Sequence, residues 1–534
     1  MRPKFCIRKW RPSSALCVLL CVFGVVAIIL PLARMISTIA TVDVSAMVKT
    51  KRFSKALRQT VAVGSVATII SVSLAGALSW AVARTNIRHK TILNTLLSVP
   101  MLIPSISHGM GLIIILGANG WLSRLLGLEF GVYGFWGIVI GSVMYSFPVA
   151  YLMLYDVIRY EDGTPYEAAE VMGLTAKDKF FAITLPYLRK PLISVVFATF
   201  TMIITDYGVP LIVGGKYLTL PVMMYQDVIG MLDFGKGAVI GVILLVPVFI
   251  TCILDMTNRD KGNAAFVGKP IRIRDSKAKL IGAKILCGIV ILWVFLPIGS
   301  FAFLGFIKKY PIDMSFSLKN IKQAVNMRAL EYLQNSLLIA FVVSFVGTSL
   351  ATINAYLTAR SKTKLSYLLH LMSIVSLAIP GLVLGLSYVM FFKSSAIYGT
   401  FAILFLVNMM HFFSSPYLMA YNTFGKLNEN LEDVGSTMGI GKLKMLKDVI
   451  LPLSFGTMVE MFSYFFVNCM MTISAVSFLA NVTNKPLALM ITTFEGQMQL
   501  ECAAFVSVLI LGVNVLMKCA VYIIKRAINK KETA

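Results

Sequence analysis

Long apolar segments recur along the chain and alternate with shorter polar segments. A helix that crosses a bilayer needs about 20 mostly apolar residues. Twelve runs reach that length, six in each half. They cover residues 14–38, 59–83, 92–116, 133–157, 192–213 and 237–256, then 281–306, 335–359, 366–391, 398–420, 456–480 and 501–524. The pattern predicts an all-α polytopic membrane protein with twelve transmembrane helices.

The first apolar run follows a basic segment with Arg2, Lys4 and Arg8, as the core of a secretory signal would. Its apolar stretch is longer than the roughly 7–15 residues of a signal core. We therefore expect a retained first span.

The two halves carry similar strings in the same order. WAVART from Trp80 parallels YLTARS from Tyr356, a shift of 276, and YLMLY from Tyr151 parallels YLMAY from Tyr417, a shift of 266. The difference of ten residues falls in the loop between the third and fourth spans, where insertions are tolerated. The chain is therefore expected to hold two repeats of six spans each.

An even number of spans makes the two repeats parallel. We expect the first domain at 1–262, a cytoplasmic linker at 263–280 and the second domain at 281–534. The shift of 276 also carries Pro104 onto Pro380. Parallel repeats often hold a transport pathway at their shared interface, whereas a duplication that serves packing alone is the alternative.

Composition and charge support this class. The 534 residues are 58% hydrophobic and only 14% charged, and the net charge is +25. Charged residues make up about a quarter of a soluble domain. Most Lys and Arg residues lie in the segments that are internal if both termini are cytoplasmic, in accord with the positive-inside rule. No continuous basic domain is present, so we expect contact with membrane lipid and none with nucleic acid.

The loop between the fourth and fifth spans, EAAEVMGLTAKDKFFAITLPYLRKP, is the most informative segment. Glu167 opens a short helix, which Gly173 should break. A second amphipathic segment follows, and Pro186 is expected to end it before the fifth span. Small residues such as Ala168 and Ala169 would let a partner surface approach closely.

This loop resembles the coupling motif of type I ABC importer permeases, and the whole chain is similar to fused permeases in which one polypeptide supplies both membrane domains. The residues that fill the motif are Glu167, Ala168, Ala169, Gly173, Ile183, Leu185 and Pro186. A second copy, LEDVGSTMGIGKLKMLKDVILP, fills it with Asp433, Gly435, Gly439, Leu451 and Pro452. The resemblance implies that each loop docks on one of two copies of an ABC ATPase subunit and that an external solute-binding protein delivers the substrate.

The resemblance also implies a translocation subunit without catalytic residues or cofactors of its own, in which ATP and Mg²⁺ bind to the partner ATPase. No Walker A string occurs, since GMLDFGKG from Gly230 ends in Gly where Ser or Thr is needed. The four histidines and eight cysteines show no metal-ligand spacing, so no metal site is expected. The expected location is the bacterial inner membrane.

Polar residues near the end of the fifth span are candidate pathway residues. Asp206 and Tyr207 lie in TDYGVPLIVGG, where Pro210 and the glycines should break the helix, and the second repeat offers Ser474 and Ser477. Broken helices can line a site with backbone groups. The alternative is a helix end near the outer headgroups with a hydrated Asp206.

Two other function classes share some of these features. A secondary transporter driven by an ion gradient would share the repeats and broken helices, but it has no reason to carry two coupling loops. An intramembrane enzyme would need a catalytic constellation, which the sequence lacks. Among ABC importers, the chain resembles permeases for iron(III) or 2-aminoethylphosphonate, with thiamine and polyamine as further substrate classes.

Overall fold

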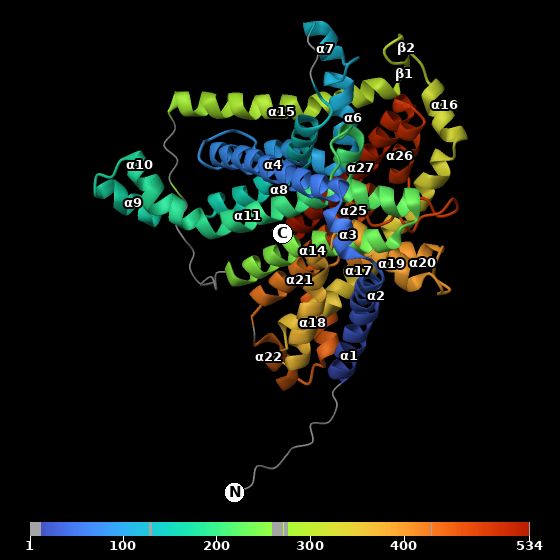
Figure 1. Ribbon diagram of the computed structural model, residues 1–534. Helices are drawn as coiled ribbons and strands as arrows, with labels where there is room; N and C mark the ends of the chain where they lie inside the picture. The colour runs from blue at the N-terminus through green and yellow to red at the C-terminus, as the bar shows by residue number, and fades with distance from the viewer. Residues whose placement is uncertain are drawn as a thin grey trace. The chain divides into compact units, whose positions relative to one another are not determined.

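The computed structural model is built from helices (Figure 1) and describes residues 12–127, 131–258, 271, 276–361, 363–428 and 430–532. Most of the predicted linker 263–280 lies outside these residues. The described chain divides into two compact units. Unit 1 comprises residues 1–41, 330–487 and 512–534, and unit 2 comprises residues 42–329 and 488–511.

Unit 2 holds the second to sixth predicted spans. Its helices are α3 (Val44–Lys49), α4 (Lys51–Ala83), α5 (Lys90–Ser98), η3 (Val99–Leu102), α6 (Ser105–Leu116), α7 (Trp121–Leu126), α8 (Phe135–Arg159), α9 (Thr164–Val171), α10 (Ala176–Lys179), η4 (Phe180–Thr184), α11 (Leu185–Thr205), α12 (Gly208–Val213), α13 (Leu220–Tyr225), η5 (Gln226–Gly230), α14 (Phe234–Asn258), α15 (Lys277–Gly305), α16 (Lys319–Asn326) and α26 (Ala488–Gly496). A small antiparallel hairpin, β1 (Ile307–Lys309) and β2 (Asp313–Phe316), is the one sheet among the described residues.

Unit 1 holds the eighth to eleventh predicted spans. Its helices are α1 (Pro12–Gly24), η1 (Val25–Ile29), α2 (Leu30–Thr38), η2 (Ile39–Thr41), α17 (Ala329–Ala359), α18 (Lys364–Val375), η6 (Ser376–Ala378), α19 (Gly381–Phe392), α20 (Phe401–Phe412), α21 (Ser414–Lys426), α22 (Leu431–Thr437), α23 (Lys442–Met445), η7 (Leu446–Ile450), α24 (Leu451–Leu453) and α25 (Phe455–Met471). The last helix, α27 (Leu500–Glu532), begins in unit 2 and continues in unit 1.

The first span of each repeat belongs to the other repeat's unit. The helix from α1 to α2 packs on α18 and α19 of the second repeat, and α15 packs on α4 and α6 of the first. The contiguous domain boundaries predicted from the sequence therefore differ from the spatial grouping.

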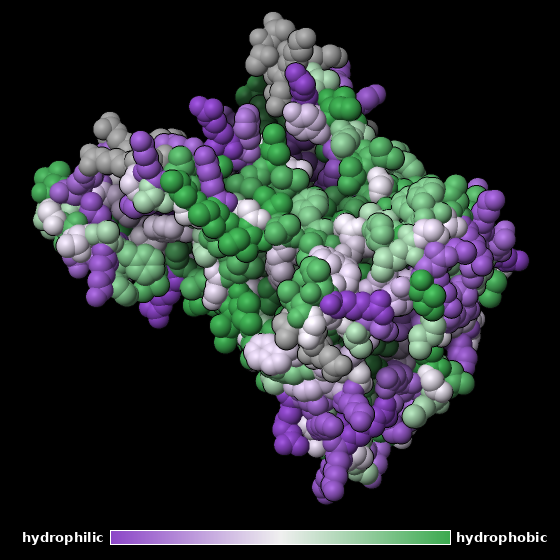
Figure 2. Space-filling view, turned by 90° about the horizontal axis from the view of Figure 1, so that it is seen from above, coloured by the Kyte–Doolittle hydropathy of each residue, from purple (hydrophilic) through white to green (hydrophobic). Residues whose placement is uncertain are grey.

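The number of apolar helices agrees with the predicted all-α membrane fold. Nine described helices are long and apolar enough to cross a membrane, and three bent pairs raise the number to twelve if each pair is one span. Figure 2 shows apolar areas on the face that it draws, beside hydrophilic ones. On α15, for example, Ile281, Ile285, Ile289 and Leu292 are all more than half exposed, which suits a face in contact with lipid.

The third span is broken in both repeats. Pro104 ends the turn after η3 and stands directly before α6, and Pro380 has the same place before α19, with nearly equal backbone angles. The break bends the second-repeat span by 110°. Each proline precedes the first residue of the new helix, where its missing N–H removes no intrahelical hydrogen bond.

Close packing holds the helix that follows this break in unit 1. A Cβ atom added at Gly385 of α19 would lie 2.6 Å from the carbonyl oxygen of Ala475, so only glycine fits without a backbone shift.

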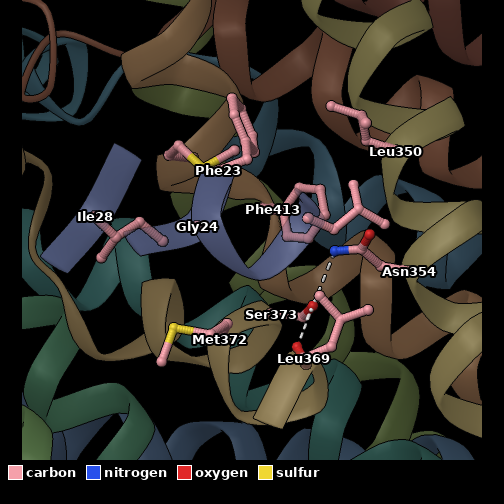
Figure 3. Close-up of a pocket in the computed structure, with 11 residues that line it drawn as sticks. Phe23, Gly24, Ile28, Leu350, Asn354, Leu369, Met372, Ser373 and Phe413 are labelled. Carbon is pink, nitrogen blue, oxygen red and sulfur yellow. Dashed lines mark hydrogen bonds between the residues drawn. The ribbon is translucent and has the colours of Figure 1, made fainter. Parts of the chain in front are cut away.

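The buried contact between α17 and α18 is partly polar: Asn354 donates to the Ser373 hydroxyl at 3.1 Å, which donates to the Leu369 carbonyl at 2.8 Å (Figure 3).

We expect Gly385→Ala to destabilise the protein by about 1–3 kcal/mol, because the added methyl group overpacks a backbone contact. Gly512→Ala is the matched control, since a Cβ at Gly512 on exposed α27 meets no atom within 4 Å. Thermal unfolding in mild detergent would measure both variants. Equal unfolding midpoints for the two would contradict the tight packing.

Candidate functional site

The two loops that match the coupling motif fold alike. In loop 1, residues Glu161–Leu185, α9 is followed by Gly173, which has a φ of +72°. In loop 2, residues Leu427–Leu451, α22 is followed by Gly439, which has a φ of +71°. The Leu174 amide donates to the Ala169 carbonyl at 3.0 Å, and the Ile440 amide donates to the Gly435 carbonyl at 2.8 Å. These bonds form a Schellman motif, which requires a left-handed residue that glycine adopts without strain.

The short helices lie at one end of their units. Figure 1 shows α9 and α10 at the end of α11 in unit 2. The second segment of loop 1 begins with a capping box between Thr175 and Asp178. Both loops then widen into a π-turn at equivalent positions, η4 in loop 1 and η7 in loop 2.

The π-turns correct one sequence prediction. Pro186 does not end the inner-loop helix, because the chain stays helical from Ala176 to Thr205. In the π-turn the Leu185 amide bonds to the carbonyl of Phe180, five residues back, and Pro186 follows where no amide is needed. Loop 2 has the same turn before Pro452, but its helix bends by 68° after Leu453.

The small residues of the motif face two directions. Ala169 is buried, and a Cβ at the equivalent Gly435 would lie 2.2 Å from the terminal carbon of Met445. Both residues therefore pack inside their own loop and do not face solvent. The exposed motif residues of loop 1 are Glu167, Ala168, Gly173, Leu185 and Pro186, whereas Ile183 is half-buried.

In loop 2, Gly439 and Pro452 are exposed and Leu451 is half-buried. Asp433 lies in α22, but its side chain is outside the described residues.

Sequence reasoning missed the most exposed apolar residues of the loops. Met172 is 76% exposed, and Met438 at the equivalent position is 70% exposed, each directly before the left-handed glycine. Val171 is 90% exposed beside Met172. The shift of 266 between the repeats carries Met172 onto Met438, which is the signal that could have found the pair.

A charged network joins loop 1 to the end of α4. Arg84 forms an ion pair with Glu161, and Tyr166 of α9 donates to the same carboxylate at 2.7 Å. The Thr184 hydroxyl meets the Tyr166 hydroxyl oxygen at 2.5 Å. Burial raises the pKa of Glu161, although the hydrogen bond from Tyr166 and the charge of Arg84 act against that shift. Burial also raises the pKa of Tyr166, to about 12, so its hydroxyl stays a donor at neutral pH.

The fifth span breaks at Asp206, within residues 205–215, where Pro210 and the glycines predict a break. Asp206 ends α11, and its carboxylate accepts hydrogen bonds from the Ser105 hydroxyl at 2.6 Å and from the Val209 amide at 3.0 Å. Pro210 lies in the first turn of α12, where an amide has no intrahelical acceptor. The Asp206 carboxylate therefore supports the break and is half-buried there.

The other candidate pathway residues lie near the corresponding break of each repeat. Tyr207 is buried and stacks on Tyr225 with ring centroids 5.1 Å apart. In the second repeat, Ser474 and Ser477 lie in the turns after α25, and Ser477 bonds to the carbonyl of Ile473. Position 472, equivalent to Asp206, is Thr, so the two repeats differ in charge at this break.

The described cavities offer no polar solute site. The pocket in unit 1 shown in Figure 3 has room for about 20 Å³, close to the volume of a single water. The pocket in unit 2 is larger, about 440 Å³, and is lined mainly by apolar residues of α15 such as Leu292, Phe295 and Phe303. Among the described residues no cluster of three His, Cys, Asp or Glu side chains could hold a metal ion.

Comparison with known proteins adds a family match to this geometry. The model of the family described as "Binding-protein-dependent transport system inner membrane component" matches residues 60–256 and 347–530. The ferric transport system permease protein FbpB of Actinobacillus pleuropneumoniae is 24% identical over 435 residues, which cover 78% of this chain and 63% of that relative. The chain therefore spans slightly less than two thirds of FbpB.

Shorter relatives match one part of the chain. The molybdenum transport system permease protein ModB of Azotobacter vinelandii is 27% identical over 180 residues, which cover 32% of this chain and 80% of ModB. The spermidine/putrescine transport system permease protein PotC homolog of Mycoplasma genitalium is 28% identical over 214 residues, which cover 38% of this chain and 69% of the homolog.

We expect Gly439→Ala to destabilise the end of α22 by about 1–2 kcal/mol, the cost of a left-handed conformation for a residue with a Cβ. Gly441→Ala is the matched control, because both glycines are exposed, neither Cβ would meet an atom within 4 Å, and only Gly439 has a positive φ. Hydrogen exchange of the α22 amides would measure the difference. If Gly441→Ala raised exchange as much as Gly439→Ala, the Schellman motif would not be the cause.

Proposed function

Because the chain belongs to the binding-protein-dependent transport system inner membrane component family, we propose that it works with a separate ABC ATPase to import a solute. One chain carries both matched regions, which confirms the predicted fused permease. The relatives are named as permease proteins, which supports a translocation subunit that leaves ATP hydrolysis to a separate protein. The predicted alternative, a secondary transporter driven by an ion gradient, is wrong, because the family depends on binding proteins and its model covers both repeats.

The twofold recurrence of the loop geometry carries this proposal. Loop 1 and loop 2 each present a short helix, a left-handed glycine and an exposed methionine at equivalent positions. Two equal docking elements suit two copies of one ATPase subunit. ATP and Mg²⁺ would bind to that subunit, and closure of the ATPase pair would shift the permease between two states of access.

The remaining partners follow from this arrangement. An external solute-binding protein would deliver the substrate, and lipid would surround the apolar helices. In the predicted topology four spans separate the N-terminus from loop 1, so both lie on the cytoplasmic side with the ATPase. The C-terminus follows twelve spans and lies on the same side.

Iron(III) is the substrate that we propose first. FbpB, which matches 78% of this chain, is named as a ferric permease, whereas the molybdenum and spermidine/putrescine relatives match about a third of it. Asp206, Tyr207, Ser474 and Ser477 are the proposed pathway residues, because they lie at or next to breaks where backbone groups leave the helix. The 2-aminoethylphosphonate, thiamine and polyamine classes are outcomes of the substrate test.

Reconstitution tests this function. The permease, its ATPase and its binding protein would be placed in liposomes, and ATP hydrolysis would be measured with the binding protein empty or loaded with iron(III). We expect hydrolysis to rise and iron to enter only with the loaded protein. Stimulation by a phosphonate, thiamine or polyamine would replace iron as the substrate, and failure of the ATPase to associate would overturn the docking role of both loops.

We expect the double variant Met172→Glu and Met438→Glu to weaken ATPase association at least about tenfold, since an anchor residue at an interface contributes more than about 1 kcal/mol. Each new carboxylate would have to lose its hydration when the loop docks on the ATPase subunit. Met498→Glu is the control, because Met498 is 87% exposed and lies in a loop on the opposite side in the predicted topology. Co-purification in detergent gives the measurement, and equal binding by both variants would contradict the prediction.

A further inference from the structure

The second span of each repeat ends in an arginine that reaches the coupling loop. Arg84 follows the last residue of α4, and Arg360 follows the last residue of α17. The shift of 276 that relates WAVART to YLTARS carries one arginine onto the other. Neither residue belongs to the coupling motif.

Arg84 lies in a nearly closed site in unit 2. Its side chain is 12% exposed and that of its partner Glu161 is 2% exposed. The guanidinium carbon is 5.1 Å from the ring centroid of Trp80 and 5.3 Å from that of Tyr166. Because Tyr166 belongs to α9 and also bonds to Glu161, Arg84 connects the end of α4 with the coupling helix of loop 1.

Arg360 makes the corresponding connection in unit 1. Its Nε donates to Glu432 of α22 at 2.7 Å, and a second nitrogen of the fork bonds to the other carboxylate oxygen. It also donates to the carbonyls of Leu427 at 3.0 Å and Asn428 at 2.7 Å. The side chains of Arg360 and Glu432 are 7% and 16% exposed. A planar guanidinium carries five donors in a rigid fork that can bind a carboxylate at two points, whereas a lysine has three donors on a single nitrogen.

The acid comes from different positions in the two loops. The shift of 266 carries Glu161 onto Leu427 and Tyr166 onto Glu432. In loop 1 the first of these positions supplies the carboxylate and the second supplies an aromatic ring. In loop 2 the first supplies a backbone carbonyl and the second the carboxylate. The two repeats therefore hold the arginine through the same two loop positions, with the carboxylate at the first position in loop 1 and at the second in loop 2.

We propose that Arg84 and Arg360 are positioning residues that fasten each coupling helix to the cytoplasmic end of the second span, so that movement of a docked ATPase is transmitted to α4 and α17. This inference rests on the proposed function. Most side chains of loop 1 are exposed, and beside the Arg84 contacts the ring of Phe180 meets that of Trp80 in α4 at a centroid distance of 6.3 Å. Without the arginine, the coupling helix would turn on the loop backbone and the span would not follow.

The double variant Arg84→Gln and Arg360→Gln tests this role, with Arg159→Gln as the control. Arg159 is an exposed cation and the last residue of α8, and its guanidinium lies over the ring of Tyr160. Its loss therefore removes a positive charge near loop 1 and leaves the ion pair of Arg84 with Glu161 in place. We expect the double variant to bind the ATPase and hydrolyse ATP, while solute uptake per ATP falls about tenfold, within the range of coupling between sites. Arg159→Gln should keep the wild-type ratio.

Exchange of the acid between the two loop positions gives the sharper test. Glu161→Leu alone should lower uptake per ATP, because it leaves Arg84 without a carboxylate. Adding Tyr166→Glu to Glu161→Leu reproduces the residues of loop 2, and we expect it to restore the ratio to within about threefold of wild type, given the context dependence of such ion pairs. Arg84→Lys should keep uptake per ATP below that of the Glu161→Leu, Tyr166→Glu variant, because the lysine keeps the charge but lacks the guanidinium fork.

A purely structural role would give a different result. In that case the variants would lower the unfolding midpoint in detergent, and intact complexes would still transport at the wild-type ratio, which would overturn the proposal. Hydrogen exchange of α9 and α22 in the permease alone reports whether the arginines hold the helices. If the wild-type permease fails to bind any ATPase, the proposed function fails, whereas a bound ATPase with unchanged coupling in the variants defeats only this inference.

Discussion

The lack of water in a bilayer decides where this chain can leave the helical conformation. Every backbone group within the apolar layer needs a partner from the protein, so a break in a span must be capped internally. At the fifth span of the first repeat, the Asp206 carboxylate supplies that partner to the amides of α12 and takes the Ser105 hydroxyl from α6. In the second repeat the chain after α25 forms tight turns without an acid, and Gly385 of α19 packs against the backbone of Ala475 there.

Loops 1 and 2 lie under a different constraint, because water can satisfy their backbone. Their shape depends on local signals: a left-handed glycine, a Schellman motif and a π-turn before Leu-Pro. What local signals do not provide is a fixed orientation relative to the spans. Ion pairs of high sequence separation, Arg84 with Glu161 and Arg360 with Glu432, join each loop to the end of a span.

Much of the fold and part of the site could be predicted from the sequence, and the reasons for the failures are specific. Length and apolarity identify spans, and repeated strings identify the duplication, because both depend on local composition. The break in the fifth span falls within the predicted segment, residues 205–215, but the sequence did not predict that the Asp206 carboxylate caps it, since that depends on contacts with the Val209 amide and the Ser105 hydroxyl. Pro186 was expected to end a helix that a π-turn carries past it. The exchange of α1–α2 and α15 between units was not predicted, because uniformly apolar helices carry no signal of their partner.

The arginine connection shows a further limit of reading repeats by identity. A residue-by-residue comparison of the loops pairs Glu161 with Leu427 and Tyr166 with Glu432, and it suggests that neither acid is shared. The fixed partner is the arginine, whose five donors accept a carboxylate from either position or a backbone carbonyl in its place. An interaction of this kind tolerates exchange of its acceptors as long as one charge remains within reach. The repeated feature is therefore the connection between span and loop, and an internal duplication reveals it only when the two structures are compared contact by contact.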